Sequence, residues 1–250
     1  MQNLSNVQWQ AYVRTVQQMH KEGTYDELAR IHFDNEQHFA GQPLLLPWLR
    51  AYLAVFQEKL HAIDPNVTVP YWDWSRDSKA PQRSAILSNT YFGGNGGRGD
   101  GRPVTSGPFA NWIVKTPTPH QLGRDFSNGS SIPAWTCPDD LDTCLQRSSY
   151  DDFRQAIETG PKASVHAGVG GRVGDMSDKQ APNDPLFWSH IAFVDLLWAE
   201  WQARNPDQAT DFPGDADQHL AGLGTRKVAD TFDTKNLGYV YPRWSAQPVL

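Results

Sequence analysis

Apolar residues recur at helical spacing in five stretches of the chain. The spacing predicts helices over residues 4–19, 25–39, 48–61, 150–159 and 185–204. In the last stretch Phe187, Ile191 and Trp198 fall on one face, and Asn205-Pro206 ends the pattern. Residues 75–133 have a loop-like pattern, and strand signals are few and short. We therefore expect a mainly α fold, with a helical core, long loops and few short strands.

Composition excludes several classes of protein. The 250 residues include 22 Lys and Arg against 28 Asp and Glu, a net charge of −6 without a basic run, which argues against nucleic-acid binding. No stretch approaches the roughly 18–20 apolar residues that span a membrane. The segment after Met1 lacks the features of a secretory signal, so we expect an intracellular protein. Cys137 and Cys144 leave both a local disulfide and two reduced thiols open.

Half of the eight histidines are candidates for a metal site, because they lie on or beside predicted core helices. These are His32, His38, His166 and His190. Helices packed around an interior can aim imidazoles from several segments at one point. Glu36 lies four residues after His32, on the same helix face. Imidazole with carboxylate suits zinc, copper, iron or nickel, so the ligand types leave the metal open.

Six segments carry a family resemblance, and they occur in the family's order. Residues 45–50 (LLPWLR) resemble the FLPWHR of tyrosinases and catechol oxidases, the type 3 copper proteins related to haemocyanins. Residues 69–75 match their PYWDWS, and 182–191 (PNDPLFWSHI) match their PNDPxFWLHH. Residues 165–171 resemble VHxxIGG, 119–126 the PHxLxRxF of the fungal branch, and 239–241 the closing Tyr-x-Tyr motif. The resemblance implies a tyrosinase-like helical bundle as a single domain over 1–250, with a core of about 4–204 and a closing segment to about 241.

The departures from the family concern its copper ligands. The family holds two coppers with six histidines, and two of those positions are still histidine here, His32 and His166. The other four are Ala40, Leu49, Lys162 and Ile191. Type 3 oxygen chemistry needs two coppers held close together by suitable nitrogen ligands. One ligand at each site cannot hold such a pair, so we expect a non-oxidative protein without a dicopper centre.

Four imidazoles remain near the old copper positions, because His38 and His190 stand beside two of the lost ligands. With His32 and His166 they are enough for one metal. Three protein ligands and an open position are typical of catalytic zinc, which acts as a Lewis acid or activates water. We therefore expect one zinc per chain; the alternative is a metal-free pocket.

The remaining site residues have roles implied by the resemblance and by their chemistry. Glu158 matches the glutamate that orients a water in tyrosinases, and is a predicted general base or fourth ligand. Lys162, if protonated, is a predicted catalytic cation that can polarise a carbonyl or epoxide oxygen. Positions around the metal or at the helix entry are expected for Glu36, Asn183 and Asp184. The predicted substrate wall consists of Trp48, Leu49, Phe187, Trp188 and Ile191.

The loss of copper ligands resembles that of cyclopenase, a zinc-associated, non-oxidative enzyme. Cyclopenase converts cyclopenin, a benzodiazepinedione epoxide, to the quinolone viridicatin with loss of methyl isocyanate. The resemblance implies a lyase-type ring contraction of a small aromatic alkaloid in fungal secondary metabolism. Two alternatives remain: a dicopper phenol or catechol oxidase, and a non-catalytic accessory or binding protein on the same scaffold.

Overall fold

Helices dominate the structure, a computed structural model that describes residues 4–177 and 179–247, and the mainly α prediction is confirmed. The α-helices are α1 (Asn6–Glu22), α2 (Thr24–Asn35), α3 (Leu45–Ile63), α4 (Pro138–Leu145), α5 (Tyr150–Ile157), α6 (Ala163–Gly170) and α7 (Leu186–Arg204). The two short strands β1 (Ile113–Val114) and β2 (His120–Gln121) pair antiparallel, with Ile113 opposite Gln121.

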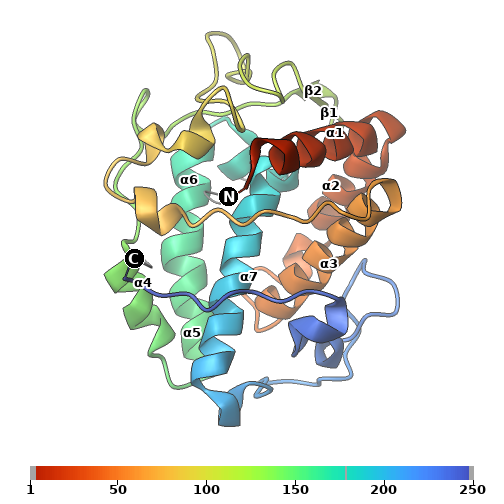
Figure 1. The fold of residues 1–250 in the computed structure, drawn as a ribbon, viewed down its shortest axis with the longest axis vertical. Helices are drawn as coiled ribbons and strands as arrows, with labels where there is room; N and C mark the ends of the chain where they lie inside the picture. The colour runs from red at the N-terminus through yellow and green to blue at the C-terminus, as the bar shows by residue number, and fades with distance from the viewer. Residues whose placement is uncertain (1–3, 178, 248–250) are drawn as a thin grey trace.

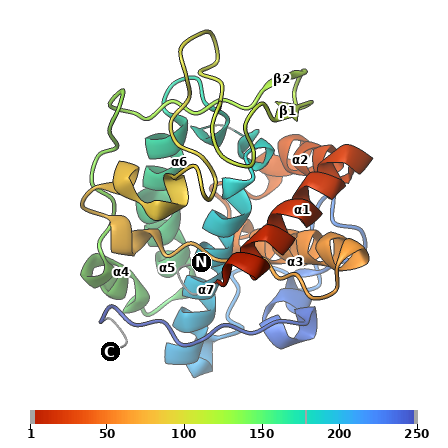
Figure 2. The same ribbon diagram turned by 45° about the horizontal axis from the view of Figure 1, so that its top comes forward.

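Helix α7 is the centre of the molecule. It lies between α5 and α6 on one side and α2 and α3 on the other, as both views show (Figure 1, Figure 2). Nearly all of its side chains are buried, as expected for a helix that is apolar on every face. One hydrophobic core extends from Trp9 to Trp244.

Several element boundaries differ from the prediction. Helix α3 begins at Leu45, because Pro47 falls in its first turn, where a missing N–H costs nothing. Helix α2 ends at Asn35, and a 3₁₀ turn follows at Glu36–His38. Helices α4 and α6 were missed. Helix α6 contains two glycines and two valines, which have low helix propensity and mask the periodicity.

Two further findings concern the cysteines and the length and apolar character of the helices. Both cysteines are free, which decides between the two alternatives for Cys137 and Cys144. Within 4–177 and 179–247, none of the helices combines the length and the apolar character that crossing a membrane requires.

The Tyr-x-Tyr motif ties the closing segment to the helical core. Asp195 on α7 accepts from Arg50 Nε (2.5 Å) through Oδ1, and from the hydroxyls of Tyr239 (2.7 Å) and Tyr241 (2.9 Å) through Oδ2. The Arg50 guanidinium also lies over the Trp198 ring, 3.7 Å from its centroid. This buried network explains the motif without a role in chemistry.

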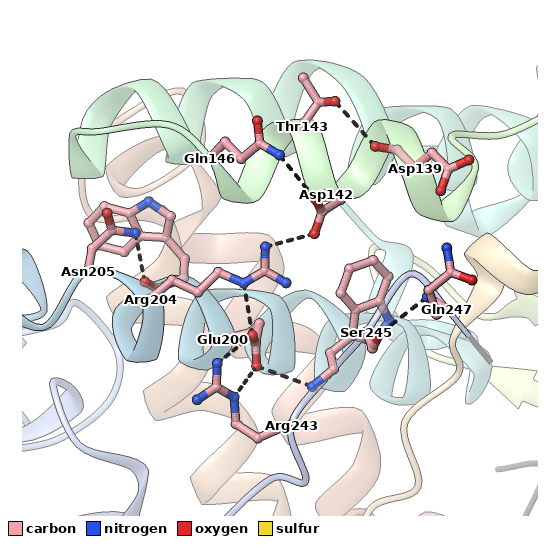
Figure 3. Close-up of polar contacts among 12 residues, drawn as sticks. Asp139, Asp142, Thr143, Gln146, Glu200, Arg204, Asn205, Arg243, Ser245 and Gln247 are labelled. Carbon is pink, nitrogen blue, oxygen red and sulfur yellow. Dashed lines mark hydrogen bonds and ion pairs between the residues drawn. The ribbon is translucent and has the colours of Figure 1, made fainter. Parts of the chain in front are cut away.

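A second anchor holds the chain just after that motif (Figure 3). Glu200 on α7 accepts from Arg243 Nε (2.8 Å), from the backbone N–H of Trp244 (3.2 Å) and from Arg204 Nε (2.9 Å). Arg204 reaches on to Asp142 of α4 at 2.7 Å. Glu200 thereby links the closing segment to α7, and Asp142 links α7 to α4.

Candidate functional site

Three of the four candidate histidines lie around one phenylalanine. Phe187, in the first turn of α7, meets the ring of His32 edge-on at 5.4 Å and that of His166 at 6.1 Å. The rings of His166 and His190 are 4.9 Å apart and nearly perpendicular. Helices α2, α6 and α7 each supply one imidazole, so the structure brings these three residues close together.

Backbone carbonyls fix the proton position on two of these rings. Nδ1–H of His32 donates to the Lys179 carbonyl at 2.8 Å, and Nδ1–H of His166 donates to the Met176 carbonyl at 2.7 Å. A carbonyl oxygen can only accept, so Nδ1 carries the proton and Nε2 of each neutral ring holds a lone pair. No residue type in the sequence indicates these backbone acceptors.

Gly170, the last residue of α6, and Gly171 directly after it allow the chain to return to His166. A Cβ at Gly170 would lie 2.1 Å from the backbone nitrogen of Ser177, and Gly171 has a positive φ of 55°. Both positions therefore require glycine. The resulting turn brings the Met176 carbonyl to the ring, which explains the paired glycines of the VHxxIGG motif.

The imidazoles are kept neutral by burial. Burial lowers the pKa of His32 to about 3, and lowers the pKa values of His166 and His190 well below the ordinary value; the positive charge of Lys162 adds to all three shifts. Nε2 of His166 and both ring nitrogens of His190 have no hydrogen-bond partner within the described residues. Such orphaned buried polar atoms are rare in native proteins and need an explanation, for which a bound ligand is one candidate.

Lys162 and Glu158 stand at the two ends of η5 (Glu158–Lys162), a π-helical turn. Oε2 of Glu158 accepts from Arg154 at 2.6 Å, and Oε1 accepts from the backbone N–H of Gly41 at 2.7 Å. Each oxygen thus accepts one hydrogen bond, which fixes the carboxylate in place; its predicted role as a general base or fourth ligand stays a prediction. Burial lowers the pKa of the Lys162 ammonium, while the negative charges of Glu158 and Glu36 oppose that shift.

The Lys162 side chain has no ion pair and no side-chain hydrogen bond within the described part of the chain. The residue is partly exposed, as are His166, Ala40 and Glu36, whereas His32 and His190 are buried. Lys162 therefore offers an uncommitted donor at the solvent side of the imidazoles.

His38 is not part of this cluster, so the prediction of a fourth imidazole is wrong. Its side chain is exposed, and its Nε2 lies 3.5 Å from Nε2 of Gln37. The reason is local: α2 ends at Asn35, and the 3₁₀ turn rotates His38 away from the helix face of His32. Glu36, on the same turn, acts electrostatically on Lys162, and among the described residues its side chain makes no hydrogen bond with an imidazole.

The donor set does not fit the metals of the family. Four of the six copper positions lack a histidine, and one of them holds a lysine. Across residues 4–177 and 179–247, no three His, Cys, Asp or Glu side chains converge in a group that could hold a metal ion. A copper pair has too few ligands here, and the usual three protein ligands of catalytic zinc are not assembled.

The predicted substrate wall divides into two parts. Trp48 meets His32 edge-on at 5.5 Å, stacks on Phe39 at 3.9 Å and lies 4.7 Å from Tyr52, and its indole N–H donates to the Ala221 carbonyl at 2.9 Å. Leu49 and Ile191 are buried, so these two positions are packed with hydrocarbon. Trp48 and Phe187 contact the imidazoles from the buried side.

Trp188 instead belongs to the core. It stacks on Phe56 at 3.7 Å with an interplanar angle of 5°, and its indole N–H donates to the hydroxyl of Tyr25 at 3.1 Å. With its ring face and polar atom both used inside the protein, the structure gives Trp188 a packing role in place of the predicted substrate contact.

Asn183 and Asp184 organise the entry to α7. Asp184 pairs with Arg124 through two hydrogen bonds of 2.6 and 2.7 Å and accepts from the backbone N–H of Leu186 at 2.9 Å. Asn183 donates to Oδ1 of Asp175 at 2.9 Å. These contacts place both residues at the N-terminal entry of α7, which is one of the two positions expected for them. They position the first turns of α7, which carry Phe187 and His190.

The sequence did not indicate a separate cavity of about 680 Å³. Its lining includes Gln57 of α3, Tyr71, Asp73 and Tyr241, and none of the predicted site residues. The polar groups of Gln57, Asp73 and Tyr241 are bonded within the protein. We therefore place the candidate site at the imidazoles.

Comparisons with known proteins show which proteins this chain resembles in sequence and in fold. A family model described as the common central domain of tyrosinase matches residues 22–204. The tyrosinase of Streptomyces glaucescens is 33% identical over 244 residues, covering 89% of this chain and 85% of that protein. The tyrosinase-like protein phomQ1' of Diaporthe leptostromiformis is 32% identical over 232 residues, covering 81% and 60%. A polyphenol oxidase structure from Thermothelomyces thermophila matches with a TM-score of 0.74 at 20% identity, covering 93% of this chain and 84% of that one, which shows a shared fold.

Proposed function

Because this chain belongs to the tyrosinase family, we propose that it is a non-oxidative enzyme acting on a small aromatic molecule at the degenerate copper site. The observation that carries the proposal is the replacement at position 162: a lysine stands where a copper ligand belongs, and its charge acts on His32, His166 and His190. Activation of oxygen requires a pair of coppers with nitrogen ligands, and this set of side chains cannot supply them.

The chain's own residues supply acid–base chemistry. The uncommitted ammonium of Lys162 can donate a hydrogen bond to a carbonyl or epoxide oxygen and stabilise negative charge that develops there. Nε2 of His166 holds a lone pair because Nδ1–H is fixed on the Met176 carbonyl, so it can accept a hydrogen bond from a bound molecule. Phe187 and Trp48 provide ring edges and apolar surface for a flat substrate beside these groups.

The cyclopenase-like ring contraction stays a prediction. A lysine donor beside a neutral imidazole is compatible with opening an epoxide and moving a proton, which supports the proposal but does not select this substrate. The one-zinc expectation also stays a prediction: bound zinc would supply Lewis-acid chemistry. Because three ligands are not assembled here, we derive no step through it.

A copper phenol oxidase is the second candidate, favoured by the names of relatives such as the Streptomyces tyrosinases. The ligand positions argue against it, because Leu49 and Ile191 are hydrocarbon and buried. A non-catalytic binding protein would keep the same fold, and turnover separates it from an enzyme.

The test is turnover without oxygen. Purified protein is incubated anaerobically with cyclopenin, with and without a chelator, and quinolone formation is followed. We expect product under both conditions, and loss of most activity in Lys162→Met and His166→Leu, with Lys59→Met on the exposed face of α3 as the matched control. Absence of product with cyclopenin and with related aromatic amides and epoxides contradicts the enzyme proposal, and product only after copper and oxygen are added supports the oxidase.

A further inference from the structure

The imidazole cluster still has the outer support of a metal site. In metal sites, a ligating imidazole almost always donates its other ring N–H to a carbonyl or carboxylate, which fixes the tautomer that can bind. His32 and His166 keep this arrangement through the carbonyls of Lys179 and Met176. The lone pairs on their Nε2 atoms, and the lone pair of the neutral His190 ring, can accept from a cation or a hydrogen-bond donor.

Lys162 is placed to be that cation. It ends the π-helical turn and precedes His166 by four residues on the helix that follows, so the two side chains share a face. Its charge acts on the rings of His32, His166 and His190 alike, and the carboxylates of Glu158 and Glu36 act on it in turn. Glu158 is itself held in place by Arg154 and Gly41.

We infer that Lys162 is a tethered cation that takes the place of a metal and excludes divalent ions from the imidazole cluster. Two effects act together. The lysine stands at one ligand position of the family, and its ammonium repels a dication near the imidazoles in a partly buried setting, where charges are poorly screened. His32 and His166 keep the fixed tautomers of metal-binding imidazoles, and Lys162→His would add a further imidazole beside them.

Metal titration tests this inference. Co²⁺ is added to the wild-type protein, Lys162→His, Lys162→Met and the control Lys59→Met, and bound ion is followed by its visible absorption. Zinc retained after desalting is counted by elemental analysis. We expect weak binding by the wild type and the control. Lys162→Met should bind roughly tenfold or more tightly because the repelling charge is gone. Lys162→His should bind still more tightly because it restores a ligand.

The location of the ion is checked by adding His166→Ala to the Lys162→His variant, which should abolish the gain. Thermal melting reports whether each variant is folded, and Lys162→Met, which keeps the aliphatic stem, covers a failure of Lys162→His. One zinc per wild-type chain, lost in His166→Ala, overturns the inference and supports the one-zinc prediction. Folded lysine variants without tighter binding also overturn it. Neither result bears on anaerobic turnover, so the proposed function stands or falls separately.

Discussion

Two buried polar regions of this protein differ in whether their charges are satisfied. In the Arg50–Asp195 network, both carboxylate oxygens accept from an arginine or a tyrosine hydroxyl. In the imidazole cluster, Nε2 of His166 and both nitrogens of His190 have no partner within the described residues, and Lys162 is unpaired. The first arrangement suits stability. The second costs stability, and this difference supports a site built for a ligand.

The largest expected effect comes from breaking the satisfied network. Arg50→Met leaves the Asp195 carboxylate buried with only tyrosine hydroxyls as donors. Losing one partner of a buried ion pair costs about 3–5 kcal/mol of the free energy of unfolding. Chemical denaturation measures the loss, with Arg30→Met in an exposed pair as the control. A loss as small as that of the control contradicts a stabilising network.

The next largest effect is a dependence of the free energy of unfolding on pH that arises from His32 in the imidazole cluster. The folded-state pKa of His32 is lowered to about 3, below its unfolded value of about 6.5, so the unfolded chain takes up the proton first. The contribution of His32 to the free energy of unfolding is therefore complete above about pH 6.5 and decreases as the pH falls. At about pH 5 the loss for this group is about 2 kcal/mol.

Unfolding of wild type and His32→Gln at about pH 7.5 and about pH 5 measures this contribution. The variant should lose less stability on acidification than the wild type does. His38→Gln is the matched control, because that imidazole is exposed. Equal acid sensitivity of wild type and His32→Gln contradicts the account of a ring kept neutral by burial.

A smaller effect of opposite sign is expected at His190. Replacing an imidazole that has two unsatisfied nitrogens with leucine removes buried polar groups without breaking a hydrogen bond. His190→Leu should raise the free energy of unfolding by about 1 kcal/mol while lowering turnover. Denaturation and the anaerobic assay are run on the same preparation. A clear destabilisation shows instead that the ring is satisfied by a partner such as an ordered water.

The smallest effect is expected at the anchor shown in Figure 3. The Arg243 side chain is 69% exposed, so its ion pair with Glu200 is screened by solvent. Arg243→Ala should cost about 0.5 kcal/mol, because Arg204 and the Trp244 N–H still donate to Glu200. Denaturation measures it against Lys59→Met, and a loss comparable to that of Arg50→Met would place this anchor among the principal stabilising contacts.

The fold could be predicted from the sequence because its motifs are themselves structural. In the PND segment, Asp184 pairs with Arg124 just before α7 begins. In the Tyr-x-Tyr segment, Tyr239 donates to Asp195 of α7. Local geometry could not be predicted. The end of α2 at Asn35, which removes His38 from the site, depends on a turn without a clear sequence signal.

For the site, the sequence predicts which residue types are present but not how they are arranged. The lost copper ligands and the lysine at position 162 are visible in the sequence. The tautomers of His32 and His166 depend on the backbone carbonyls of Lys179, 147 residues from His32, and of Met176, 10 residues from His166, which no residue type reveals. The bond from the Gly41 N–H to Glu158 likewise depends on tertiary placement, 117 residues apart in sequence.

Oxygen uptake with catechol, on protein incubated with copper and then desalted, tests the central claim most directly. With hydrocarbon at positions 49 and 191 and an amine at 162, we expect no uptake above that of heat-denatured protein and less than one retained copper per chain. Two retained coppers per chain with catechol-dependent oxygen consumption would contradict the account and identify the protein as an oxidase.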